Sequence, residues 1–166
     1  MNLPAWLEGL NIALPLAPWQ QFGLAFLLGS FTVATWSDLK HLMAQREFVE
    51  IWLLFVAAML LFDCYHAYQG QASAQTVGIK WVLIALLSVL SLRQVGPLFR
   101  LAAADVAALA AAASLLTPVL VVLFYAVAKL IALLLRPWLA RGRSTWPFMP
   151  VVSLATLAIL ALAWWS

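Results

Sequence analysis

Apolar segments of membrane-spanning length recur along this 166-residue chain, and they constrain its fold more than any other feature. Hydrophobic residues make up 66% of the sequence and charged residues only 9%, which excludes an ordinary soluble domain. An α-helix needs about 20 mostly apolar residues to cross the hydrocarbon layer of a bilayer. We therefore expect an all-α, polytopic membrane helical bundle of about six transmembrane helices, embedded in the lipid bilayer of the plasma membrane.

Prolines, polar stretches and changes of composition divide the chain into six predicted spans. Residues 1–17 contain no lysine or arginine, so they lack the basic region of a signal peptide, and we expect an N-terminal interfacial segment there. Residues 18–166 then form a single transmembrane domain. Its spans are predicted at about Pro18–Trp36, Val49–Tyr68, Val77–Leu92, Leu101–Leu116, Pro118–Leu135 and Phe148–Trp165, with a basic loop over Arg136–Pro147 before the last.

The distribution of lysine and arginine predicts how these spans are oriented. If both termini lie outside, seven of the nine basic residues fall on the inner side, which is the usual excess of positive charge in cytoplasmic loops. They are Lys40, Arg46, Arg93, Arg100, Arg136, Arg141 and Arg143. This topology places Asp38 at the inner end of the first span and Asp105 about one turn into the inner end of the fourth. We expect both carboxylates on the cytoplasmic side at similar depth.

Asp38 and Asp105 are the candidate catalytic residues, because carboxylates within a membrane are rare and usually functional. Two carboxylates a few ångströms apart repel each other as charges and hold one proton between them. Such a pair performs the chemistry of an aspartyl protease: the ionised carboxylate takes a proton from the attacking water, and the protonated one polarises the peptide carbonyl. The alternative is that each aspartate is a helix-end residue that reaches water or a neighbouring basic group.

The sequence around these aspartates resembles the type IV prepilin peptidases and archaeal preflagellin peptidases, which are GxGD-type membrane aspartyl proteases. Asp38-Leu39-Lys40 is similar to the first aspartate motif of that family, Asp-Leu-Arg/Lys. Ala102-Ala103-Ala104-Asp105-Val106 looks like its Gly-x-Gly-Asp motif with alanine in place of both glycines, and Trp146-Pro147-Phe148-Met149-Pro150 is similar to its Pro-Phe-x-Pro element. Glycine permits dihedral angles and close backbone approach that alanine resists, so the two alanines bear on activity more than on fold.

The resemblance implies that residues 18–166 form a six-helix peptidase-like domain that removes the basic leader from pilin-like or flagellin-like precursors at the cytoplasmic face. It implies water as the nucleophile, without a cofactor or a metal. The substrate is expected to carry a short basic leader followed by a hydrophobic helix, and Glu47 and Glu50 are candidate substrate-binding residues for that leader. Alternatively, the glutamates pair with Lys40 and Arg46 on a surface helix, since Arg46 and Glu50 are spaced i,i+4.

Two other functions are compatible with the same residues. One is a catalytically inactive, peptidase-like subunit that acts in the assembly of a larger membrane complex or forms a homo-oligomer. The other is a small transporter that uses the intramembrane Asp and Lys residues, although the sequence has no clear internal repeat and no paired interrupted spans. Because the basic residues are spread through loops, no nucleic-acid partner is predicted, and the single cysteine excludes an internal disulfide.

Further polar residues lie within the predicted spans. Lys129 either extends its side chain to the cytoplasmic interface or neutralises Asp38 or Asp105, and an ammonium group there would discourage the shared proton. Near the outer end of the second span, Asp63 and His66 share a helical face, with Cys64 between them. Two or three ligands from one helix end are too few for a metal site on their own, so no metal is predicted.

Overall fold

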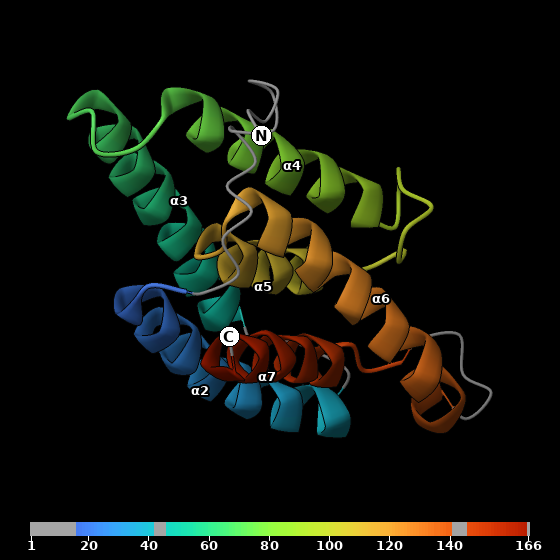
Figure 1. Ribbon diagram of the computed structural model, residues 1–166. Coiled ribbons are helices and arrows are strands. Elements are labelled where there is room, and N and C mark those ends of the chain that lie inside the picture. The colour runs from blue at the N-terminus through green and yellow to red at the C-terminus, as the bar shows by residue number, and fades with distance from the viewer. Residues whose placement is uncertain (1–15, 42–45, 141–145, 166) are drawn as a thin grey trace.

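The computed structural model describes residues 16–41, 46–140 and 146–165, and within these ranges the chain forms helices and no β-strand. The all-helical part of the predicted fold class is therefore confirmed. Most of the predicted interfacial segment, together with Arg141 and Arg143, lies outside the described residues. The six described helices are α2 (Pro18–His41), α3 (Arg46–Tyr68), α4 (Ala74–Ser91), α5 (Ala103–Ser114), α6 (Pro118–Ala140) and α7 (Met149–Trp165) (Figure 1).

Four of these helices, α2, α3, α4 and α6, are long and apolar enough to cross a membrane. The helices α5 and α7 are also apolar but shorter, with 12 and 17 residues. At the usual rise of an α-helix, α5 covers only about 18 Å of bilayer depth. The set of long apolar helices supports a membrane location, as the composition predicts.

The helix α6 is longer than predicted. The expected span ended at Leu135, because Pro137 lacks the backbone N–H that a continuing helix uses and because a basic loop was predicted from Arg136 onward. The helix instead continues through Pro137 to Ala140. Pro137 and its two neighbours are exposed, and only three residues of the helix follow the proline. The proline is therefore tolerated there.

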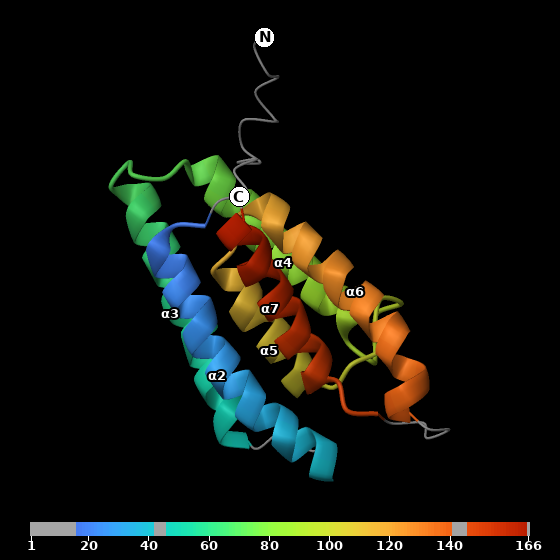
Figure 2. The ribbon, with the colours of Figure 1, turned by 60° about the horizontal axis from the view of Figure 1, so that its bottom comes forward.

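The short helix α5 lies at the centre of the bundle, and the other five described helices pack around it (Figures 1 and 2). Every residue from Val106 to Ser114 is buried, and most of them are alanine. Small side chains let neighbouring helices approach closely where no hydrophobic effect separates helix from lipid. The C-terminal end of α5 is tied to α2 by Gln20, whose Nε2 donates a hydrogen bond of 2.6 Å to the carbonyl oxygen of Leu115.

Successive helices run in alternating directions, so that α2, α4 and α6 end on the side where α3, α5 and α7 begin (Figure 2). This side, called the basic end below, is defined by the exposed residues Lys40, Arg46, Arg93, Arg100 and Arg136.

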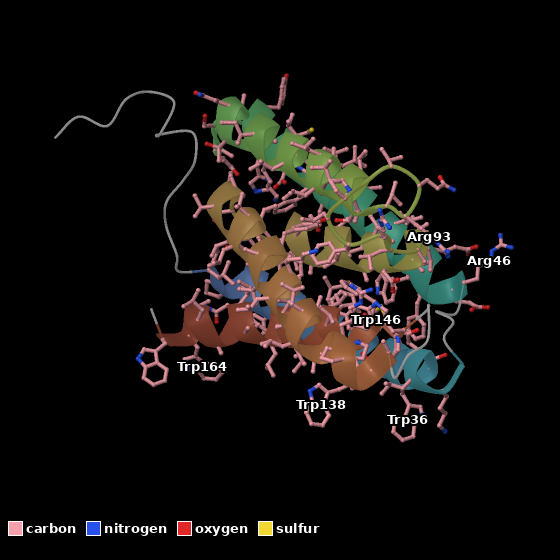
Figure 3. All side chains as sticks on the ribbon, turned by 90° about the vertical axis from the view of Figure 1, so that its right-hand side faces the viewer. Trp36, Arg46, Arg93, Trp138, Trp146 and Trp164 are labelled. Atoms are coloured by element: carbon pink, nitrogen blue, oxygen red, sulfur yellow. The ribbon has the colours of Figure 1, made fainter. Side chains whose placement is uncertain are left out.

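Tryptophans mark both ends of the bundle. In Figure 3, Trp36, Trp138 and Trp146 lie toward the basic end with Arg46 and Arg93, whereas Trp164 lies at the opposite end. Trp36, Trp138 and Trp164 are 65%, 77% and 88% exposed, which is expected of side chains that sit at the two membrane–water interfaces.

Candidate functional site

Asp38 lies in the last turn of α2 at the basic end, with only 7% of the residue exposed. Its Oδ2 accepts a hydrogen bond of 3.0 Å from the backbone N–H of Met149, the first residue of α7. The N–H groups in the first turn of a helix have no partner inside the helix, and a carboxylate there also interacts favourably with the helix dipole. Asp38 therefore caps a helix that begins 111 residues further along the chain.

A second polar contact joins α2 to α7 one turn further from the basic end. The hydroxyl oxygens of Thr35 and Ser153 are 2.9 Å apart. Thr35 precedes Asp38 by three residues, so both side chains lie on one face of α2. Ser153 follows Met149 by four residues, so both residues lie on one face of α7. These two contacts align α2 with α7 and fix where the Asp38 carboxylate lies.

Asp105 occupies the first turn of α5, three residues after the N-cap residue Ala102. Its carboxylate interacts with the backbone N–H of Ala102, which is one half of a capping box. Ala102 has φ −68° and ψ 156°, an extended conformation open to alanine as well as to glycine. The residue that replaces the first motif glycine of the resembled family therefore fits here without backbone strain.

Asp38 and Asp105 both lie at the basic end, because α2 ends there and α5 begins there (Figure 2). The charge of Asp38 acts on the Asp105 carboxylate, so the two groups are electrostatic neighbours. Among the described side chains, lysine and arginine form two ion pairs, Arg46 with Glu50 and Lys80 with Asp63, and neither includes this pair of aspartates. Two carboxylates can hold one shared proton when they come within a few ångströms of each other and no cation compensates them.

Within the described part of the chain, the contacts of Lys129 are with the α4–α5 loop at the basic end and not with Asp38 or Asp105. Its Nζ donates a hydrogen bond to the backbone carbonyl of Leu98 and lies 5.1 Å from the centre of the Phe99 ring. Both partners belong to the loop between α4 and α5. Lys129 therefore holds this loop against α6, and its positive charge is directed to a carbonyl and an aromatic face.

The aromatic side chains next to the aspartates form a continuous cluster. The Phe148 ring lies between the rings of Phe99 and Trp146, with centroid distances of 5.4 and 5.5 Å and edge-on geometry. Phe148 is 2% exposed and directly precedes the Met149 amide that binds Asp38. The cluster thus connects the α4–α5 loop, which leads into the Asp105 turn, with the start of α7.

Glu47 and Glu50 are exposed in the first part of α3, also at the basic end. The Oε1 of Glu50 lies 2.7 Å from the Nε of Arg46, which is the i,i+4 pair considered as the alternative to substrate binding. The two side chains are 61% and 89% exposed, so the ion pair contributes only about 0.2–1 kcal/mol. Glu50 is therefore free to exchange Arg46 for a basic group of another molecule.

Asp63 belongs to a separate polar cluster between α3 and α4, toward the opposite end. Its Oδ2 accepts hydrogen bonds of 2.6 Å from Lys80 Nζ and 2.8 Å from Trp81 Nε1. His66 has a different partner, since its Nδ1 lies 3.0 Å from the Phe62 carbonyl oxygen. Within the described part of the chain, no three Asp, Glu, His or Cys residues gather as metal ligands would.

Sequence reasoning singled out the two aspartates but not the groups that position them. Their main partners are the backbone amides of Met149 and Ala102, which no side-chain motif marks. One residue in the sequence does indicate the Met149 amide. Proline is favoured in the first turn of a helix, so Pro150 predicts that a helix, with its unpaired backbone N–H groups, begins close to this position. The Thr35–Ser153 contact carries no comparable signal, because isolated hydroxyls are common in membrane helices.

No family model, no curated protein and no solved structure matches this chain.

Proposed function

We propose that the protein is a membrane aspartyl endopeptidase that removes the basic leader from pilin-like or flagellin-like precursors, with Asp38 and Asp105 as its catalytic pair. One observation carries the proposal: at the basic end, the Asp38 carboxylate at the end of α2 accepts the first N–H of α7, and its charge acts on Asp105 at the start of α5. These segments contain the three elements in which the sequence resembles the type IV prepilin and archaeal preflagellin peptidases. The alternating directions of the helices place all three segments at one end, and the contact of Asp38 with Met149 and the effect of its charge on Asp105 link them within that end.

In the proposed reaction, the aspartate pair begins with one proton. Each aspartate interacts with a backbone N–H, so we assign the roles by convention: Asp38 is written as the ionised member and Asp105 as the protonated one, and the reverse assignment balances equally. Asp38 takes a proton from water as the water oxygen attacks the peptide carbon, and Asp105 gives its proton to the carbonyl oxygen. When the C–N bond breaks, Asp38 passes its proton to the leaving nitrogen and Asp105 recovers one from the diol.

The proposed substrate matches the surroundings of this pair. A hydrophobic helix would lie in the bilayer beside the bundle, with its leader at the basic end on the cytoplasmic side. Glu47 and Glu50 supply exposed negative charge at that end for a basic leader. The proposed chemistry requires water alone as a co-reactant.

A second candidate function is that of an inactive peptidase-like subunit that assists the assembly of a membrane complex. A specific observation favours it. Asp38 and Asp105 each cap a helix, through Met149 and Ala102, and this structural role would retain both aspartates without catalysis.

Cleavage by purified protein in liposomes separates the two candidates. We expect the wild-type protein to cut a basic-leader precursor and Asp38→Asn and Asp105→Asn to lose cleavage at unchanged expression and melting temperature. The matched control is the double variant Asp63→Asn, Lys80→Gln, which removes an aspartate near the opposite end without leaving an unpaired charge. Cleavage that survives in both Asn variants would reject the peptidase. A wild-type protein inert toward a panel of precursors, but isolated with stable partners, would favour the assembly subunit.

A further inference from the structure

The loop between α4 and α5 carries two arginines that open onto one hollow. This hollow has a volume of about 390 Å³ and is lined by Arg93, Gln94, Val95, Gly96, Pro97 and Arg100. Both guanidinium-bearing residues are exposed, and neither belongs to the ion pairs found among the described residues. Arg46, at the same end, is instead paired with Glu50. The hollow therefore presents two available cations to whatever lies outside it.

The loop that forms the hollow has a fixed backbone. The Leu98 N–H donates to the Leu90 carbonyl at 3.0 Å, and the Leu101 N–H donates to the Ser91 carbonyl at 2.8 Å. The Arg93 N–H donates back to the Leu101 carbonyl at 2.9 Å. These bonds fold the loop against the last turn of α4, so the backbone positions of both arginines are fixed beside the hollow.

Two residues of the loop have unusual constraints. Gly96 lies so close to α4 that a Cβ atom there would be 1.7 Å from the Leu90 carbonyl oxygen. Arg100 has a φ of 60°, which is uncommon for a residue other than glycine. A non-glycine residue in this region is a reason to look for a function of the side chain.

The position of the hollow relative to the membrane indicates the class of ligand. Arg93 lies at the end of the bundle that carries Trp36, Trp138 and Trp146, where tryptophans mark the level of lipid headgroups (Figure 3). Val95, at the rim of the hollow, is 66% exposed and so presents an apolar side chain beside the two cations. A cationic hollow with an apolar rim at this depth suits a molecule with a phosphate and an acyl chain.

We propose that the hollow of the α4–α5 loop binds the headgroup of an anionic phospholipid. Arg93 and Arg100 donate charge-assisted hydrogen bonds to the phosphate oxygens, and guanidinium groups suit this because they bind oxyanions in a bidentate manner. The acyl chains extend past Val95 into the bilayer. This site is independent of the proposed peptidase reaction and uses none of its residues.

Native mass spectrometry of the full-length protein in detergent tests the site with three probes: phosphatidylglycerol, phosphatidylcholine and glycerol 3-phosphate. We expect phosphatidylglycerol to bind the wild type preferentially and Arg93→Gln, Arg100→Gln to weaken that binding about tenfold or more. The control variant Arg46→Gln, Arg136→Gln makes the same change in net charge at the same end, outside the hollow, and should keep its affinity within about twofold.

Equal losses in the two double variants would overturn the proposal, because they would show a general response to charge. Equal binding of phosphatidylcholine, or equally tight binding of glycerol 3-phosphate, would also overturn it. If the hollow variant melts at a lower temperature than the wild type, Arg93→Gln alone replaces it, since Arg93 does not share the positive φ of Arg100. A loss of about threefold or more in that single variant is expected, and unchanged binding would contradict the site.

Discussion

The carboxylate of Asp38 accepts the backbone N–H of Met149 at 3.0 Å, so the end of α2 caps the start of α7. Asp38 therefore has two roles that can be tested separately: it caps α7, and in the proposed reaction it transfers a proton. An acceptor oxygen is sufficient for capping, whereas proton transfer in the proposed reaction requires a carboxylate. Substitutions that keep or remove the oxygen therefore distinguish stability from catalysis.

The first prediction concerns capping by Asp38. Asp38→Ala should lower the free energy of unfolding by about 1 kcal/mol, because it removes the acceptor for Met149, whereas Asp38→Asn should stay near the wild type. Unfolding in mixed micelles, followed by tryptophan fluorescence, measures both variants. Equal stability of the Ala and Asn variants would show that the bond contributes nothing to the fold.

The second prediction concerns the buried ion pair between Lys80 and Asp63. Lys80→Met should destabilise the protein by about 3–5 kcal/mol, because it leaves the Asp63 charge without its partner. Adding Asp63→Leu to the same variant should recover most of that loss, since no charge then remains. The same unfolding assay reports both results, and a double variant as unstable as the single one would contradict the account of this pair.

The third prediction concerns the loop glycine at position 96. Gly96→Ala should cost about 1–3 kcal/mol, because the new methyl group would press on the backbone of Leu90. Gly78→Ala is the matched control: it lies inside α4 with open space around it and should stabilise the helix by about 0.5–1 kcal/mol. Thermal melting in detergent checks the pair, and a neutral Gly96→Ala would mean that the loop does not pack as described.

The fourth prediction concerns the contact between Thr35 and Ser153. A double-mutant cycle with Thr35→Val and Ser153→Ala should give a coupling energy of about 0.6 kcal/mol, the usual size for such a bond between membrane helices. The three variants and the wild type are compared by unfolding free energy. Strict additivity would show that the two hydroxyls do not interact.

The helices follow from the sequence more completely than the contacts between them. The approximate bounds predicted at Pro18, Tyr68 and Pro118 agree with the structure, because proline and polar breaks limit apolar runs, whereas α2 continues to His41, beyond the predicted end at Trp36. The end of α6 also differs from the prediction, since Pro137 breaks a helix only where its freed carbonyl lacks another partner.

The partners of the site residues were beyond sequence reasoning for a related reason. The sequence predicts that Lys129 reaches the interface or an aspartate, but it does not predict the Leu98 carbonyl as its partner, because every residue has a carbonyl. Asp38 likewise binds a backbone amide. The sequence shows which charged side chains need a hydrogen-bond partner. Which backbone group becomes that partner depends on how distant segments pack together.

Residual cleavage by Asp38→Asn, Asp105→Asn and the double variant tests the central claim most directly. If the two carboxylates act as one unit, each single variant should lose about 10²–10⁴-fold in cleavage rate, and the double variant should be no slower than either. Rates are measured on a basic-leader precursor in liposomes, at matched protein amounts and with melting temperatures recorded. A single variant that keeps the wild-type rate, or losses that multiply in the double variant, would contradict a shared catalytic pair.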